Sequence, residues 1–120
     1  MKIFIYILFL FIINGCEKTK LLPITSENLI EIISNLKGEK AVLVNIWALW
    51  CIPCVEEFPM IMKLQKEKND LEVIFVSADF QEQFQDVLLF LNEHNVGPVS
   101  YIKKQKDDPF IEGLHPSWSG

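Results

Sequence analysis

Two cysteines separated by two residues are the part of this 120-residue chain best suited to chemistry. They stand in the pentapeptide Trp50-Cys51-Ile52-Pro53-Cys54. Such a pair can form one redox couple that exchanges disulfides through mixed-disulfide intermediates. The main alternative is half of a zinc site, but a closed structural site needs four ligands and the only other cysteine is Cys16. The pair therefore predicts thiol-disulfide chemistry.

The segments on either side of the pair predict a strand and a helix. Residues 41–47 form a short, β-branched and nearly all apolar run, which is typical of a strand buried on both faces. After the pair, apolar residues recur at helical spacing, at Val55, Phe58, Ile61, Met62 and Leu64. We therefore place the cysteines where a central strand turns into a helix.

This placement predicts a role for each cysteine. The free amides and the positive dipole end of a helix N-terminus favour a thiolate and lower the pKa of a thiol there. Cys51, at the terminus, is therefore the expected nucleophile. Cys54 lies one turn deeper and resolves the mixed disulfide by attacking the Cys51 sulfur. Pro53 suits the first turn, where its missing amide hydrogen would have no helical partner.

The N-terminal segment has the pattern of an export signal. Residues 3–13 are an unbroken apolar run after a basic Met1-Lys2 start, of signal-peptide length and too short for a comfortable membrane span. Ile13-Asn14-Gly15-Cys16 resembles the lipobox of bacterial lipoproteins, which implies cleavage after residue 15 and lipid attachment to Cys16. An ordinary cleavage site and an uncleaved N-terminal anchor are the alternatives.

Composition limits the remaining chain to one acidic domain. The formal net charge is −5, and removal of residues 1–15 with Lys2 makes it −6, which argues against a nucleic-acid surface. About a hundred residues suffice for one core. We predict a leader at 1–15, a polar linker at 16–24 and one domain at 25–120.

The domain alternates helices and strands. We expect a helix capped by Ser26 and ended by Gly38, a strand at 71–77, a helix at 81–95 and a short strand at 99–102. A charged run follows. This alternation predicts right-handed crossovers, a mostly parallel sheet and a site at the carboxyl end of a strand.

Residues 42–64 resemble the thioredoxin fold and, within it, the TlpA/ResA-like branch of membrane-tethered thiol-disulfide oxidoreductases. The resemblance is carried by Asn-x-Trp, Trp-Cys-x-Pro-Cys and a following Glu-Phe-Pro, and more weakly by 73–79 as the next strand and its exit loop. It implies an α/β thioredoxin-like fold, with Cys51 as nucleophile and Cys54 as resolving thiol. Asn45 departs from the thioredoxins proper, which place a buried aspartate there, so their proton-relay carboxylate is absent.

The resemblance adds three further site residues. It implies that the acid Glu57 lies near the thiols and tunes them, although a solvated acid beside Glu56 is an equally reasonable interpretation. Trp50 is expected to shield the thiols and, with Pro53, to contact substrates, whereas Trp47 is expected to pack in the core or a loop.

The resemblance also implies parts that we do not find in this chain. The family places a cis-proline opposite the cysteine pair, then an antiparallel hairpin and a last helix. We therefore expect an incomplete fold without that hairpin and helix. Pro116 is a candidate for the cis-proline by spacing alone.

Other polar residues have less distinctive settings. His94 is expected to close a helix, and His115 to lie in a loop beside Pro116. Both are interpreted as surface or capping residues. Asp107 and Asp108 are interpreted as a solvated turn before Pro109.

Together these observations predict a lipid-anchored monomer of the cell envelope that reduces protein disulfides outside the cytoplasm. It would need no metal or organic cofactor, and a membrane thiol donor would supply its electrons. The alternatives are a peroxidase-type redoxin that uses Cys51 alone, and a truncated lipoprotein without catalytic activity.

Overall fold

The computed structural model describes residues 18–104 and 106–115, except for the side chain of Asp108. The expected leader at 1–15, the expected lipid-attachment site Cys16 and the proline candidate Pro116 lie outside the described residues. No helix within the described part is both long enough and apolar enough to cross a bilayer.

Helices and strands alternate along the described chain. In order, they are β1 (Lys20–Ile24), α1 (Ser26–Leu36), β2 (Ala41–Trp47), α2 (Ile52–Glu67), β3 (Leu71–Ser77), a short 3-10 turn η1 (Gln81–Gln83), α3 (Phe84–Glu93), β4 (Val99–Lys103) and α4 (Asp107–Leu114). The strand before the cysteine pair and the helix after it are confirmed. Thr25, and not Ser26, caps α1 by accepting a hydrogen bond from the Asn28 amide at 3.3 Å.

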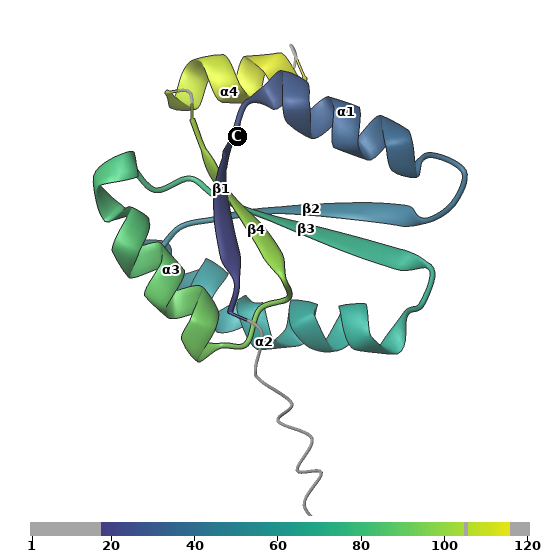
Figure 1. Cartoon of the computed structure of the whole chain (residues 1–120), viewed down its shortest axis with the longest axis horizontal. Coiled ribbons are helices and arrows are strands. Elements are labelled where there is room, and N and C mark those ends of the chain that lie inside the picture. Colours follow the sequence, from purple (N-terminus) through teal and green to yellow (C-terminus); the bar gives the residue numbers. More distant parts are fainter. Residues whose placement is uncertain (1–17, 105, 116–120) are drawn as a thin grey trace, which may run out of the picture.

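The described strands form one parallel sheet in the order β1-β4-β3-β2. Helices α1 and α4 cover one face of the sheet, and α2 and α3 cover the other (Figure 1). This three-layer arrangement confirms the predicted α/β class with parallel strands. Among the described strands, β2 lies at one edge of the sheet and β1 at the other.

Two apolar clusters fill the layers, and β3 contributes to both. Val73 and Phe75 pack with α2 and α3, whereas Ile74 and Val76 pack with α1 and α4. Because successive strand residues point to opposite faces, a strand covered on both sides must be apolar throughout. This explains the continuous apolar run of β3.

One boundary predicted from the sequence is wrong. Residues 20–24 are not part of a polar linker but form β1, which pairs in parallel with all five residues of β4. The chain is fixed even before the strand, because the buried Thr19 hydroxyl donates to the Val96 carbonyl and the Thr19 amide donates to Asn92 Oδ1 at 2.9 Å. The domain therefore begins by Thr19.

A second difference concerns the charged run near the end of the chain. Asp107 and Asp108 do not form a turn before Pro109; all three residues lie in the first turn of α4, where a proline is tolerated, and Asp107 remains exposed. This helix packs against α1 so closely that a Cβ on Gly113 would lie 2.8 Å from the Cβ of Ser26. Phe110 of α4 is buried in the cluster beneath both helices.

Candidate active site

The cysteine pair lies at the junction of a strand and a helix, as predicted, but this strand, β2, lies at an edge of the described sheet and not at its centre. A turn after β2 is closed by a hydrogen bond from the Cys51 amide to the Ala48 carbonyl at 3.1 Å. Cys51 is the N-cap of α2, and its sulfur accepts from the Cys54 amide at 3.4 Å. The two cysteines form a disulfide, with 5.3 Å between their Cα atoms.

This geometry favours a nucleophilic Cys51 after reduction. The Cys51 sulfur faces an amide of the first helical turn, where the helix dipole stabilises negative charge. Both cysteines are half-buried, and Cys54 packs against the apolar cluster between the sheet and α2. Cys51 therefore has the better setting for a thiolate, and Cys54 is close enough to attack its sulfur.

The side chains around the disulfide are exposed and mainly apolar. Trp50 is 70% exposed and Ile52 is 69% exposed, while Pro53 is also at the surface. Exposed side chains of this size are unusual, because most Trp and Ile residues bury much of their surface on folding. They provide apolar contact area on both sides of Cys51.

An aromatic cluster holds α2 against the sheet. Phe58, fully buried on α2, packs with Trp47 of β2 at 4.9 Å and with Phe75 of β3 at 4.5 Å between ring centroids. Phe90 of α3 completes the cluster at 5.3 Å from Phe58. Trp47 is thus a core residue, as predicted. The indole nitrogen of Trp47 and the side-chain nitrogen of Asn45 are buried without a hydrogen-bond partner in the described part.

A further polar residue of the site, Asp79, was not expected from the sequence, and its side chain is fully buried. Its carboxylate accepts from the Leu49 amide at 3.0 Å and from the Ser77 hydroxyl at 2.7 Å. Leu49 lies in the turn that leads to Cys51. The only sequence signal was an acidic residue directly after a buried strand, at the carboxyl edge of the predicted sheet.

The remaining candidates are Glu57 and two histidines. Glu57 is exposed on α2, three residues after Cys54. His94 caps the C-terminus of α3, with its Nδ1 2.9 Å from the Phe90 carbonyl, which agrees with the predicted capping role. His115 follows the last residue of α4. Within residues 18–104 and 106–115, no cluster of three or more His, Cys, Asp or Glu side chains has the geometry of a metal site.

A parallel sheet with helices on both faces, and a disulfide at the N-terminus of the helix after β2, define the thioredoxin-like class of thiol-disulfide proteins. The family model described as Redoxin matches residues 22–106, and the chain belongs to this family. No solved structure matches the chain significantly.

Known relatives agree with this assignment. Thioredoxin-like protein YneN of Bacillus subtilis is 46% identical over 55 residues, which cover 42% of this chain and 32% of the relative. The thiol-disulfide oxidoreductase ResA of Oceanobacillus iheyensis is 36% identical over 74 residues, covering 59% and 37%. The thiol:disulfide interchange protein CycY of Rhizobium leguminosarum is 38% identical over 58 residues, covering 48% and 29%.

These relatives confirm the resemblance to the TlpA/ResA-like branch. The aligned parts amount to about a third of the length of each relative, so the chain matches only a portion of them.

The two tryptophans beside the site should respond differently to substitution. Trp47→Ala removes a buried ring from the aromatic cluster and should lower the free energy of unfolding by about 3–5 kcal/mol. Trp50→Ala removes an exposed ring and should change it by about 0.5 kcal/mol or less. Urea unfolding of both variants measures the difference. Equal losses of stability would contradict the placement of Trp47 in the core and Trp50 at the surface.

Proposed function

We propose that this protein is a thiol-disulfide oxidoreductase that reduces protein disulfides through Cys51 and Cys54. The observation that carries the proposal is the disulfide between the N-cap of α2 and its first turn, at the carboxyl end of a parallel strand. Active sites of open α/β sheets lie at the carboxyl ends of their strands. Membership of the redoxin family and similarity to ResA and CycY support the same activity.

The proposed reaction uses both thiols and transfers two electrons. The Cys51 thiolate attacks one sulfur of a substrate disulfide, forms a mixed disulfide and releases the first substrate thiolate. The Cys54 thiolate, formed by loss of its proton, then attacks the Cys51 sulfur and releases the second substrate thiolate. The substrate gains two electrons, and the enzyme is left with the Cys51–Cys54 disulfide. Both electrons come from the thiol pair, so we propose that no organic or metal cofactor is needed.

Trp50 and Pro53 are proposed to contact the substrate. Both are exposed beside the half-buried Cys51, so a polypeptide whose disulfide approaches the Cys51 sulfur would meet them first. A tryptophan ring supplies a large, stiff apolar contact at little cost in conformational entropy. This fits substrates that present their disulfide on a flexible, partly apolar segment.

The proposal includes a cellular location for the protein and a source of its electrons. We propose that the protein is a monomer tethered to the cell envelope through a lipid on Cys16, and that a membrane thiol donor returns the disulfide to the dithiol state. The lipobox-like sequence before Cys16 and the similarity to ResA and CycY support this arrangement. An extracytoplasmic domain would need such a donor because the reducing systems of the cytoplasm do not reach it.

Glu57 is proposed to adjust the reactivity of the thiols by its negative charge. It is exposed and one helical turn beyond Cys54, so water and salt weaken its effect. A nearby negative charge disfavours a thiolate and raises the thiol pKa.

Substitution of each cysteine should separate the two roles. Cys51→Ser should abolish the reduction of insulin disulfides, because no thiolate remains at the helix terminus. Cys54→Ser should form the mixed disulfide but not resolve it, so a covalent complex with the substrate should accumulate on a non-reducing gel. Full insulin reduction by Cys51→Ser would overturn the proposal. Undiminished reduction of peroxide by Cys54→Ser would instead support a single-cysteine peroxidase.

Glu57→Gln should increase the rate at which iodoacetamide alkylates reduced Cys51 at neutral pH. We expect an increase of about threefold or less, because the carboxylate is exposed. Glu56→Gln is the matched control, since it removes the same charge from the adjacent exposed position on α2. Equal rates for both variants and the unmodified protein would assign Glu57 to the solvated surface.

Cys16→Ala should release the protein from the membrane. In bacterial cells that express the full chain, labelled fatty acid should enter the unmodified protein and not the variant, and the variant should move to the soluble fraction. Absence of label from the unmodified protein, together with membrane association of both proteins, would favour an uncleaved N-terminal anchor over lipidation.

A further inference from the structure

A buried carboxylate holds the turn that leads into the cysteine pair. Asp79 follows β3, the neighbour of β2 in the sheet, and its side chain is fully buried. Both of its carboxylate oxygens lie within hydrogen-bond distance of the Leu49 amide nitrogen, at 3.0 Å for Oδ2 and 3.3 Å for Oδ1. This contact joins residues that are 30 positions apart in the sequence.

The Leu49 amide needs this partner. Leu49 is the second residue of the turn that the Cys51 amide closes onto the Ala48 carbonyl, and the inner amides of such a turn have no acceptor within it. Leu49 is half-buried, so its amide would lose part of its access to water if it had no acceptor, and a carboxylate is a stronger acceptor than a neutral group. The position of Asp79 therefore determines where the turn can lie.

Asp79 is itself held in one orientation. The buried Ser77 hydroxyl donates to Asp79 Oδ2 at 2.7 Å, and the Asp79 amide donates to the Ser77 oxygen at 3.1 Å. In addition, the Ala78 amide donates to the Trp47 carbonyl at 2.7 Å, which ties the same segment to the end of β2. The carboxylate has little freedom to follow a displaced turn.

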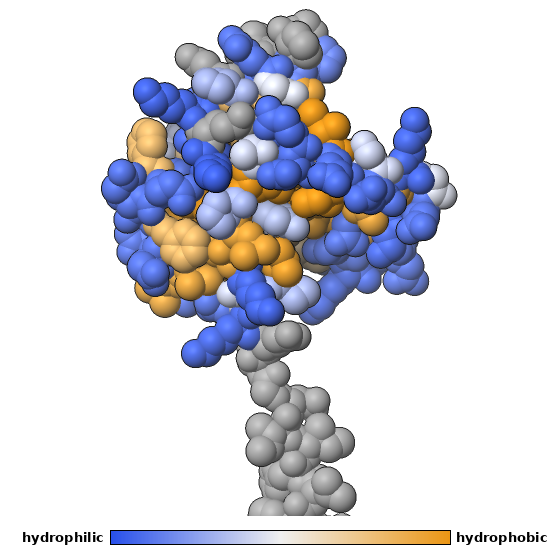
Figure 2. Space-filling model, turned by 45° about the horizontal axis from the view of Figure 1, so that its top comes forward, coloured by the Kyte–Doolittle hydropathy of each residue, from blue (hydrophilic) through white to orange (hydrophobic). Residues whose placement is uncertain are grey.

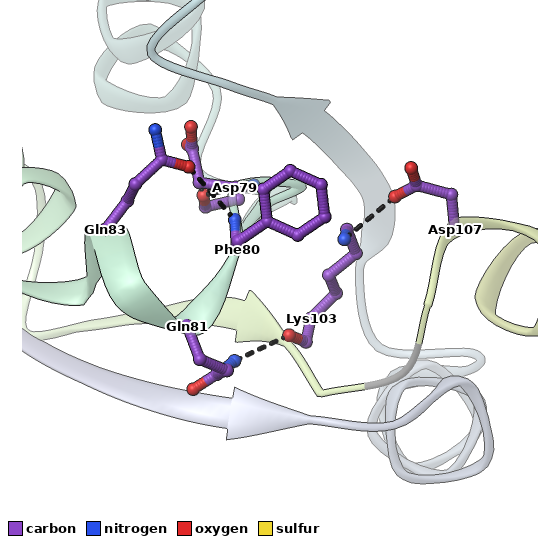
Figure 3. Close-up of polar contacts among 7 residues, drawn as sticks. Asp79, Phe80, Gln81, Gln83, Lys103 and Asp107 are labelled. Atoms are coloured by element: carbon purple, nitrogen blue, oxygen red, sulfur yellow. Dashed lines mark hydrogen bonds and ion pairs between the residues drawn. The ribbon is translucent and has the colours of Figure 1, made fainter.

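The segment after Asp79 is held by further contacts, among them one with Lys103 of β4 (Figure 3). Gln81 Nε2 donates to the Lys103 carbonyl at 2.7 Å, and the Phe80 amide donates to Gln83 Oε1 at 3.2 Å. The Lys103 ammonium lies 5.0 Å from the centre of the Phe80 ring and 2.8 Å from Asp107. Lys103 is only 4% exposed, and its contacts connect the segment after β3 with β4 and α4.

We propose that Asp79 is a positioning residue for the active site, which holds the turn before Cys51 so that the Cys51 sulfur meets the N-terminus of α2. Only Trp50 separates Leu49 from Cys51, so a displacement of the Leu49 amide shifts the N-cap of the helix. The atoms that Asp79 contacts are an amide and a hydroxyl, which distinguishes this role from proton exchange with a thiol. For its bearing on catalysis, the inference rests on the proposed function.

The test compares Asp79→Asn with Asp79→Ala in the full, reduced chain. The asparagine retains an oxygen that accepts from the Leu49 amide, whereas alanine leaves that amide without a partner. Alkylation of Cys51 by iodoacetamide at neutral pH, followed by mass spectrometry of the peptide, should fall about threefold to tenfold in Asp79→Ala, the size of a helix-terminus effect. Asp79→Asn should stay within about twofold of the unmodified protein, since the acceptor is retained.

A second readout is the equilibrium with glutathione. A less favoured thiolate makes the reduced pair less stable, so Asp79→Ala should shift the equilibrium toward the Cys51–Cys54 disulfide. Asp79→Asn should not. A purely structural role would lower the unfolding midpoint of the variants and leave both readouts of the folded protein unchanged.

Two further variants keep the test decisive. Ser100→Ala is the control, because it removes a buried hydroxyl that donates to the Phe75 carbonyl at 3.3 Å, away from the turn, and it should leave Cys51 alkylation unchanged. Ser77→Ala frees one side of the Asp79 carboxylate and should slow alkylation in the same direction as Asp79→Ala, by a smaller factor. This variant decides the matter if Asp79→Ala does not fold.

The outcomes that overturn the inference are specific. Equal changes in Asp79→Asn and Asp79→Ala would mean that Asp79 acts through its charge, and unchanged alkylation in Asp79→Ala or in its substitute Ser77→Ala would mean that it does not position Cys51. Neither measurement needs a protein substrate. The expected alkylation pattern without insulin reductase activity would therefore contradict the proposed function and leave this inference standing.

Discussion

The packing of Phe58 against the sheet is the contact on which the site depends. Its ring lies among aromatic rings of β2, β3 and α3, so α2 cannot slide or rotate without opening the core. Since Cys51 and Cys54 occupy the cap and first turn of that same helix, the core fixes their position relative to the end of β2. The exposed side chains around the disulfide then lie on a rigid base. Figure 2 shows orange, apolar areas between hydrophilic ones on one face of the molecule.

Local pattern was sufficient for the elements that carry the cysteines. The β-branched run of β2 and the helical spacing from Val55 to Leu64 are properties of adjacent residues, so the strand, the helix and the junction between them could be predicted. Pro59 lies inside α2 without ending it. The capping role of His94 was equally local, because its ring contacts a carbonyl four residues before it.

Features that depend on distant residues were missed. β1 is short, contains Pro23 and is stabilised by pairing with β4, which lies near the other end of the described chain. Helix α4 begins with Asp107, and the acidic residues with the following proline also fit a turn; packing of Phe110 beneath α1 favours the helix. Asp79 is buried where its carboxylate accepts a hydrogen bond from the Leu49 amide, 30 positions earlier in the sequence, and no local pattern predicts that contact. The comparison with the thioredoxins concerned position 45 of β2, where this chain has Asn45. The buried carboxylate of this chain belongs to Asp79, which follows β3.

If the proposed lipid on Cys16 is present, the hydrogen bonds of Thr19 limit how far the domain can move from the membrane. Thr19 is buried and hydrogen-bonded to the end of α3 and to the loop before β4. This residue, held in the domain, is only three positions after Cys16. Three residues of extended chain reach at most about 11 Å. A domain attached through Cys16 would therefore rest beside the lipid headgroups with one preferred side toward them, and substrates would have to approach it from the remaining directions.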